Sequence, residues 1–158
     1  MKQGDFLVFR TNGWAARWIQ LFTRSRWNHA AIYIGDGRIV EAEPTGVRIT
    51  NLHEAYTDDQ WIVSGKTLTS WQRNKIVTWA KSKEGTPYGW LDIAALGLLS
   101  LGIRWKWLDR FAADQSRLVC SQLVSYAYFN AGIPLTNDDA WTVTPGDLEE
   151  LIVEAEAK

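Results

Sequence analysis

The stretch that decides the fold is WNHAAIYIGDGRIVEA, residues 27–42. Two mostly apolar runs, 30–34 and 38–42, flank the tripeptide Gly35-Asp36-Gly37. Glycine and aspartate tolerate positive φ, so this composition between two such runs is typical of a tight turn in a β-hairpin. The sequence therefore predicts an antiparallel pair of strands in the N-terminal half of the chain.

The register of this hairpin brings a base and an acid together. A register centred on Asp36 sets Ala31 opposite Glu41, which makes His29 the diagonal neighbour of Glu41 on the same face. Glu43 lies nearly opposite His29 and is a competing partner. A lone strand histidine is commonly structural and most glutamates are solvated, but a carboxylate in an apolar strand needs a partner. The hairpin thus predicts a pair of an imidazole and a carboxylate.

The other segments predict an α+β fold with a small, mostly antiparallel sheet packed against helices. Alternation and turn residues indicate further strands at 5–10, 47–50 and 61–64. Helical spacing and capping residues indicate helices at 14–23, from an N-cap at Ser70 to Gly85, at 90–103, at 120–131 and from Thr144 onward. The polar residues 56–59 are expected to connect two strands.

Composition limits the class of protein. The 158 residues are 46% apolar, which suits one domain, residues 1–158. Basic and acidic residues number 17 and 18, so no strong field favours nucleic acid, and no nucleic-acid partner is expected. Ten tryptophans are expected to be mostly core, with Trp105 and Trp107 left open between core and interface.

The single cysteine and the first ten residues suggest a compartment. One cysteine excludes an internal disulfide, and a free thiol survives best in a reducing environment. The stretch MKQGDFLVFR lacks the long apolar run of a secretory signal. We therefore expect a cytoplasmic protein as synthesised, released by lysis if it is encoded by a phage.

The cysteine lies in LVCSQLVSYAYFNAG, residues 118–132, at the start of an apolar helical pattern. The backbone dipoles at a helix N-terminus stabilise a thiolate, and its unpaired N–H groups can bind an oxyanion. The alternative is that Cys120 is a small core residue that begins an inward-facing stripe, as free cysteines often are. The helix pattern alone favours this core role, whereas the thiol taken together with the base and acid of the hairpin forms the parts of a cysteine nucleophile site, which is the working hypothesis.

These motifs resemble the permuted branch of the NlpC-type papain-like superfamily, which includes YiiX-like and lecithin:retinol acyltransferase-like proteins. The resemblance rests on H-A-A-I-Y-I-G-D-G, V-E-A and C-S-Q-L-V followed by A-G-I-P-L, with G-D-F at 4–6, T-P-Y at 86–88 and T-P-G-D-L at 144–148. It implies a circularly permuted papain-like fold in which Cys120 is the nucleophile, His29 the base and Glu41 the orienting third residue. Several members have histidine in that third position, so the chain resembles the glutamate-bearing subgroup.

Other chemistries have less support. His53 and the adjacent Glu54 do not have a zinc-site spacing, and His53 is expected at the surface. The serines lack the G-x-S-x-G motif of a serine hydrolase, and no glycine-rich phosphate loop follows a strand. Neither a cofactor nor a metal is expected. Tyr88, in a turn, either lends a hydroxyl to the pocket or covers the core.

The resemblance implies attack on an acyl carbonyl of a small peptide or a lipid-like substrate. The expected reaction is hydrolysis of an amide, such as a peptidoglycan peptide bond. Lipid ester or amide chemistry would use residues 90–103 with Arg104, Lys106 and Arg110 as a peripheral membrane contact, although this stretch also fits a core helix followed by a solvated turn. A non-catalytic binding module with the same fold is the third alternative. Glu41 and Glu43 remain alternatives for the third position, and the sequence does not define the oligomeric state.

Overall fold

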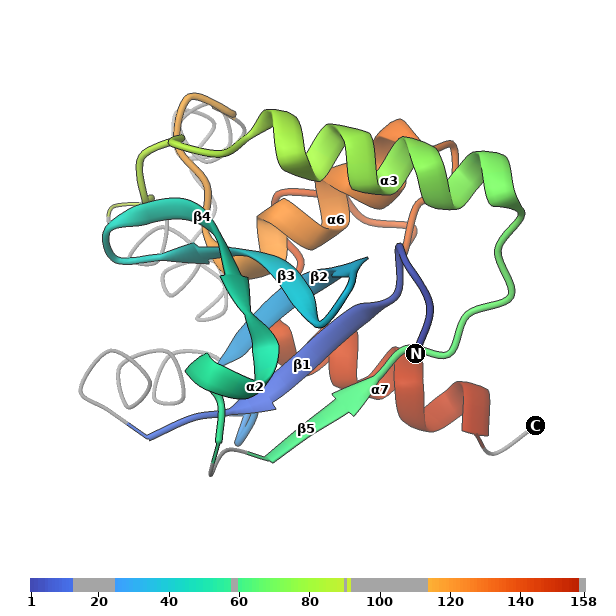
Figure 1. The fold of residues 1–158 in the computed structure, drawn as a ribbon. Helices are drawn as coiled ribbons and strands as arrows, with labels where there is room; N and C mark the ends of the chain where they lie inside the picture. The colour runs from blue at the N-terminus through green and yellow to red at the C-terminus, as the bar shows by residue number, and fades with distance from the viewer. Residues whose placement is uncertain (13–24, 58–59, 90, 92–113, 157–158) are drawn as a thin grey trace.

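The computed structural model describes residues 1–12, 25–57, 60–89, 91 and 114–156. Its centre is a sheet of strands in the order β4-β3-β2-β1-β5, in which every neighbouring pair is antiparallel (Figure 1). The strands are β1 (Phe6–Arg10), β2 (His29–Gly35), β3 (Arg38–Glu43), β4 (Gly46–Asn51) and β5 (Gln60–Val63). The helices are α2 (Leu52–Ala55), α3 (Ser70–Ser82), α6 (Cys120–Asn130) and α7 (Pro145–Glu156). The predicted α+β class and antiparallel sheet are confirmed.

The hairpin has the predicted register, with Ala31 opposite Glu41. Asp36 and Gly37 have φ values of 53° and 72°, the positive values that a two-residue turn of the I′ type needs. The pairing becomes irregular only next to the turn, between Tyr33 and Gly35. The turn and the strand pattern therefore agree on which residues share a face.

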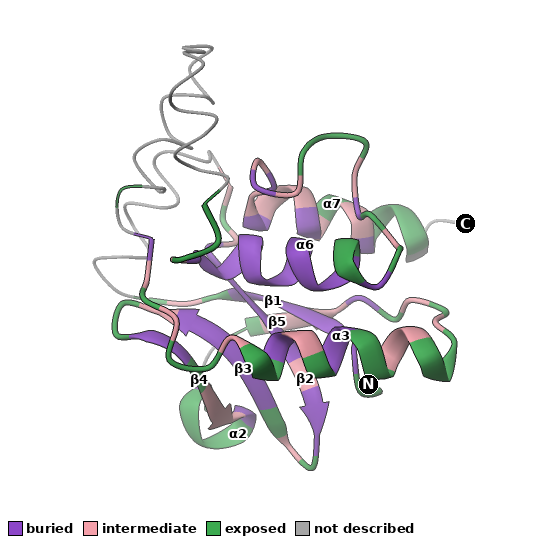
Figure 2. Cartoon of the chain, turned by 90° about the horizontal axis from the view of Figure 1, so that it is seen from above, coloured by how far each residue is buried: buried purple, intermediate pink, exposed green. Residues whose placement is uncertain are grey.

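The two faces of the sheet carry separate apolar clusters. One face packs against α3, α6 and α7, whose buried residues include Ile76, Leu123 and Leu148. In Figure 2 strands β1 to β3 and helix α6 are largely buried, whereas α3 and α7 have exposed outer sides. The smaller cluster on the opposite face lies beside α2 and contains Leu7, Phe9, Ala31, Ile39, Leu52 and Tyr56.

Two helix starts show how local sequence sets the boundaries. The N-cap of α3 is Thr69 instead of the predicted Ser70, because the Thr69 side chain and Gln72 exchange hydrogen bonds with each other's backbone N–H. Helix α7 begins as predicted after Thr144, where the backbone N–H of Thr144 donates to Asp147 at 2.8 Å.

The connection between β4 and β5 differs from the predicted polar segment at 56–59. It begins with the short helix α2, which the prediction did not include, and Tyr56 is buried.

The G-D-F motif near the N-terminus ties the first strand to the helices. Asp5 forms a buried ion pair with Arg73 of α3 at 2.8 Å. Gly4, at φ 84°, accepts a hydrogen bond at 2.6 Å from the Tyr128 hydroxyl of α6.

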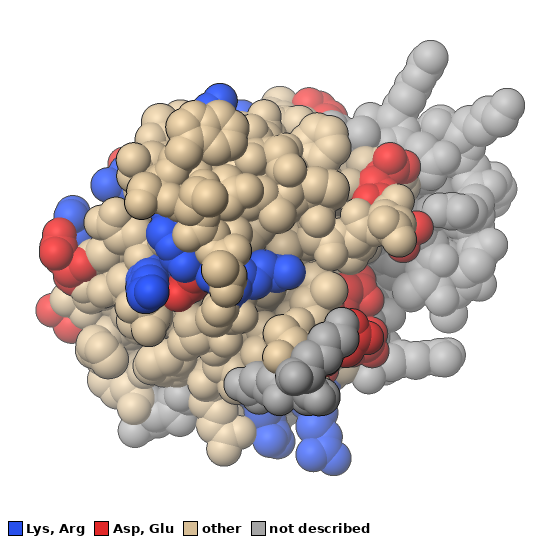
Figure 3. All heavy atoms as spheres, turned by 90° about the vertical axis from the view of Figure 1, so that its right-hand side faces the viewer, with Lys and Arg blue, Asp and Glu red and all other residues tan. Residues whose placement is uncertain are grey.

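On the face shown in Figure 3, basic and acidic side chains are interspersed among uncharged ones, in keeping with a net charge of −1.

Several predictions concern the tryptophans and residues outside the described ranges. Of the five described tryptophans, Trp141 is buried in the core, Trp27, Trp61 and Trp79 are half-buried and pack against it, and Trp71 is exposed, so the expectation of core burial holds for Trp141, holds in part for three and is wrong for Trp71. Two predicted segments lie outside the described residues. They are the helix at 14–23 and the segment 90–110 with Trp105 and Trp107, in which Leu91 alone is described. None of the described helices is long and apolar enough to span a membrane.

Candidate active site

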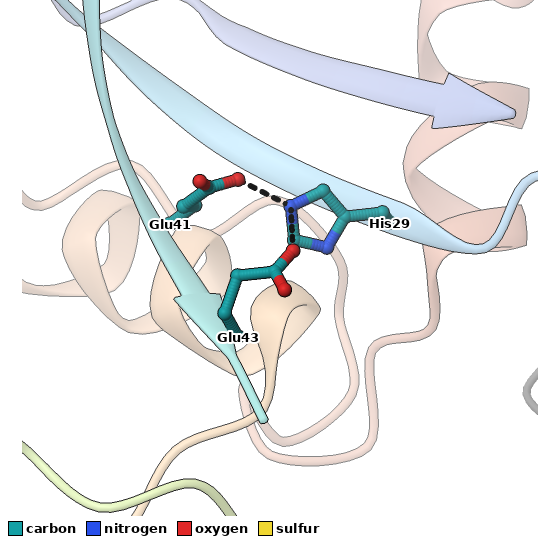
Figure 4. A group of neighbouring side chains, drawn as sticks. All are labelled: His29, Glu41 and Glu43. Carbon is teal, nitrogen blue, oxygen red and sulfur yellow. Dashed lines mark hydrogen bonds and ion pairs between the residues drawn. The ribbon is translucent and has the colours of Figure 1, made fainter. Parts of the chain in front are cut away.

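The predicted base and acid are in contact. His29, the first residue of β2, has its Nε2 2.9 Å from Oε2 of Glu41 in β3. Both residues are buried, and the Glu41 side chain is fully enclosed. Figure 4 shows the two glutamates of β3 directed toward the imidazole ring. The diagonal relation predicted from the hairpin register therefore produces a direct contact.

Glu41 is held from three sides. Its Oε1 accepts a hydrogen bond from Nε of Arg48 at 3.0 Å and forms an ion pair with Nη2 of the same side chain, also at 3.0 Å. Its Oε2 accepts a hydrogen bond from the Tyr56 hydroxyl and faces His29. Burial alone would raise the pKa of the Glu41 carboxyl, but the hydrogen bond and charge of His29, the Tyr56 hydroxyl and the Arg48 guanidinium lower the pKa. Glu41 is thus a buried carboxylate that stays ionised.

Glu43 is the weaker partner of the imidazole. Its Oε1 lies 3.7 Å from Nε2 of His29 and 3.3 Å from the Tyr56 hydroxyl. Its side chain is 29% exposed, whereas that of Glu41 is fully buried. Distance and burial both favour Glu41 as the group that orients His29.

The thiol is a further partner of the imidazole. Cys120 is the first residue of α6, is 2% exposed and shares a hydrogen bond with His29. Since Nε2 faces the carboxylate, Nδ1 is the nitrogen left for the thiol. Burial lowers the pKa of His29, but the hydrogen bonds and negative charges of Cys120 and Glu41 raise it to about 10. The structure brings Cys120, His29 and Glu41 together.

Tyr88 also lies beside this cluster. The T-P-Y turn is fixed between β4 and the start of α6, because Thr86 accepts from the backbone of Val47 at 2.8 Å and Pro87 accepts from Leu118 at 3.0 Å. Burial, followed by the charges of Cys120 and Glu43, raises the pKa of the Tyr88 phenol. Tyr88 is therefore a protonated phenol near the thiol.

Two residues of the site, Arg48 and Tyr56, were not among the predicted ones. Arg48 is the direct cross-strand partner of Glu41, so extending the hairpin register by one strand would have found it. Tyr56 comes from the segment after α2, and no periodicity in the sequence indicates that it folds back over the sheet.

The site also contains a set of donor atoms that suits a divalent cation. Nε2 of His29 and a carboxylate oxygen from each of Glu41 and Glu43 lie within 4.8 Å of one another. However, both oxygens of Glu41 already accept hydrogen bonds from Arg48, Tyr56 or His29. Among the described residues, the cluster is thus better matched to holding an imidazole than to holding a metal.

The fold and the site define an α+β protein with a thiol, an imidazole and a carboxylate in one buried cluster. The family model described as "NlpC/P60 family" matches residues 1–66 of this chain. That segment contains all five strands, His29, Glu41 and Glu43, and it ends before Cys120.

A relative and a solved structure extend the match. The chain is 26% identical to the "Probable lipoprotein peptidase YaeF" of Escherichia coli strain K12 over an alignment of 171 positions. That alignment covers 94% of this chain and 62% of the relative. The chain therefore spans less than two thirds of that relative. The crystal structure of the metalloprotein YiiX from Escherichia coli O157:H7 shares the fold, with a TM-score of 0.61 and 22% identity over 85% of this chain and 68% of the other.

Together these findings show that the chain is similar to the NlpC/P60 family over its first 66 residues, to YaeF in sequence over most of its length, and to YiiX in fold. The architecture is consistent with a papain-like fold.

Proposed function

We propose that the chain is a cysteine hydrolase in which Cys120 is the nucleophile, His29 the general base and acid, and Glu41 the orienting carboxylate. The observation that carries this proposal is that the buried imidazole of His29 is hydrogen-bonded to both Cys120 and Glu41. A base that contacts a nucleophile on one side and an orienting group on the other is the arrangement that nucleophilic catalysis requires.

The reaction would proceed through an acyl-enzyme. The Cys120 thiolate attacks an acyl carbonyl, and backbone N–H groups at the N-terminus of α6 stabilise the oxyanion. The His29 imidazolium then gives its proton to the leaving amine as the carbon–nitrogen bond breaks. In the second half, neutral His29 takes a proton from water, the resulting hydroxide attacks the thioester, and the carboxylate product leaves as the Cys120 thiolate re-forms.

The proposed substrate is an amide of the peptidoglycan peptide type. The relative YaeF is named a lipoprotein peptidase, which supports an amide over an ester. The near-neutral net charge of the chain gives little attraction to anionic lipid. The alternatives are a lipid-like acyl substrate, reached through a peripheral membrane contact, and a binding module without catalysis.

The test is to detect the covalent intermediate. The protein is incubated separately with muropeptides and with phospholipid vesicles, and each sample is analysed by intact-mass spectrometry and for released products. An acyl adduct on Cys120 with cleaved muropeptide supports the proposal, whereas acyl transfer from vesicles alone would replace the amide by a lipid substrate. Because Cys120 is only 2% exposed, the absence of any adduct together with an inert thiol would favour the binding module.

Thiol reactivity gives a test that needs no substrate. Paired with imidazolium, Cys120 is expected to react with iodoacetamide well below pH 8.5, the approximate pKa of an ordinary thiol. His29→Ala should slow this reaction at pH 6 by about tenfold or more, because the thiolate loses its cation. Identical labelling curves in the two proteins would remove His29 from the mechanism.

Divalent metal binding is a second candidate function. It is favoured by the three donor atoms of His29, Glu41 and Glu43, and YiiX, which shares the fold, is described as a metalloprotein. Calorimetric titration of the chain with Zn²⁺, compared with Glu43→Gln, tests it. Binding that Glu43→Gln weakens would support a metal site, and the absence of binding heat would exclude it.

A further inference from the structure

We propose that Tyr56 is a positioning residue that makes Glu41, and not Glu43, the partner of His29. The inference rests on the proposed function of the same site, and it adds a residue that touches neither the substrate nor the nucleophile. It starts from the position of the Tyr56 hydroxyl between the two carboxylates that compete for the imidazole.

The contacts of the Tyr56 hydroxyl are unequal. It donates to Oε2 of Glu41 in a short hydrogen bond and lies 3.3 Å from Oε1 of Glu43. A phenol carries one hydrogen, so only one carboxylate can receive a full hydrogen bond. The distances from His29 follow the same order, 2.9 Å to Glu41 and 3.7 Å to Glu43. Tyr56 and His29 therefore both select Glu41.

The ring of Tyr56 fixes the imidazole as well. It stacks on His29 with centroids 5.8 Å apart and an interplanar angle of 26°, and it packs on Phe9 at 4.4 Å. The backbone N–H of Tyr56 donates to Leu52 at 3.0 Å, so α2 holds the ring in place. One side chain thus sets both the ring plane of the base and the orientation of its carboxylate.

The charges around Glu41 predict what loss of the hydroxyl does. The titratable and charged groups of the site are His29 from β2, Glu43 from β3, Arg48 from β4, Tyr56 after α2, Tyr88 from the T-P-Y turn and, across the imidazole, Cys120 from α6. The hydroxyl favours the charged form of Glu41, so removing it raises the pKa of Glu41. The carboxylate is then neutralised at a higher pH, and the imidazolium loses its partner.

The test compares Tyr56→Phe with Tyr33→Phe. Tyr56→Phe keeps the stacked ring and removes only the hydroxyl. Tyr33→Phe is a matched control, because the hydroxyl of Tyr33 accepts from Gly37 at the hairpin turn. The rate of Cys120 alkylation by iodoacetamide is measured from pH 4 to 9, and the titration of His29 is followed by NMR in the same proteins.

In the wild type, the rate of Cys120 alkylation falls as the pH is lowered. For Tyr56→Phe we expect this fall to begin about one pH unit higher, so that labelling at a given acidic pH is about tenfold slower. The pKa of His29 should fall, and Tyr33→Phe should match the wild type in both measurements. Adding Glu43→Gln to Tyr56→Phe should slow labelling further, whereas Glu43→Gln alone has little effect.

The outcomes separate this inference from the proposed function. A Tyr56→Phe protein whose His29 titration and alkylation profile equal those of the wild type overturns the positioning role. If the wild-type thiol behaves as an ordinary one but Tyr56→Phe still shifts the titration of His29, the proposed hydrolase function fails and the positioning role stands. An equal shift in Tyr33→Phe would show a general effect of losing a tyrosine hydroxyl and would overturn the role of Tyr56.

Discussion

The same two strands, β2 and β3, build two different environments on their opposite faces. Ile32 and Val40 point to the face that packs against the helices, where the cluster is largely hydrocarbon. His29 and Glu41 lie on the alternate face, within a network of hydrogen bonds and charges. Alternation with a period of two therefore separates the residues of the apolar core from His29 and Glu41 of the proposed catalytic cluster.

Cys120 joins the two environments. It belongs to the apolar cluster on the helix side, yet it shares a hydrogen bond with His29. This is geometrically feasible because His29 is the first residue of β2 and Cys120 the first residue of α6, so both lie at element ends. The site thus forms where the two environments meet, and substitutions on either side should have separable effects.

The largest expected effect is the loss of the nucleophile. Cys120→Ser should reduce hydrolysis by at least about 10³-fold and abolish the acyl adduct, because a serine hydroxyl does not ionise beside His29 at neutral pH. Ser125→Ala, which removes a buried hydroxyl from the same helix, is the matched control and should keep its activity. Turnover that persists in Cys120→Ser would move the chemistry to another residue.

The next effect concerns the two carboxylates of β3. Glu41→Gln should lower turnover by about 10²–10⁴-fold, since an amide holds the imidazole in the wrong tautomer. Glu43→Gln should change turnover less than about threefold, because Glu43 is farther from His29 and partly exposed. Steady-state kinetics of both variants decide the comparison, and the reverse order would make Glu43 the third residue.

Much of this site could be predicted because it depends on local patterns. The strand alternation and the turn at Asp36 and Gly37 are sufficient to place His29 beside Glu41. The position of Cys120 follows from where its helical pattern starts. In each case residues close in sequence, or one helix boundary, determine the geometry.

Arg48 and Tyr56 show why the rest could not be predicted. Arg48 required the register of a second hairpin, although its strand was recognised. Tyr56 depends on a four-residue helix, α2, which is too short to give a periodic pattern, and on a fold-back over Phe9 that only tertiary packing specifies. That His29 and Cys120 meet likewise depends on the packing of α6 against the sheet.

A substitution on the helix side should affect stability and spare the chemistry. Ile32→Ala removes a fully buried side chain and should cost about 2–5 kcal/mol of unfolding free energy, or roughly 5–15 °C in Tm. Calorimetry or circular dichroism measures the change. The pH profile of Cys120 alkylation in the folded protein should match the wild type, and a shifted profile would show that the two faces are coupled.

The smallest expected effect is at the turn that joins the two strands. Gly37 has φ 72°, and an added Cβ would meet no other atom within 4 Å, so Gly37→Ala costs only backbone strain, about 1 kcal/mol. Gly37→Asn should cost less, because asparagine tolerates this conformation. Thermal melts compare the three proteins, while Cys120 labelling reports whether His29 still faces Glu41. Because strand pairing on both sides of β2 also fixes the register, labelling should not change in either variant. Slower labelling in folded Gly37→Ala would show instead that the turn itself sets the register of the site.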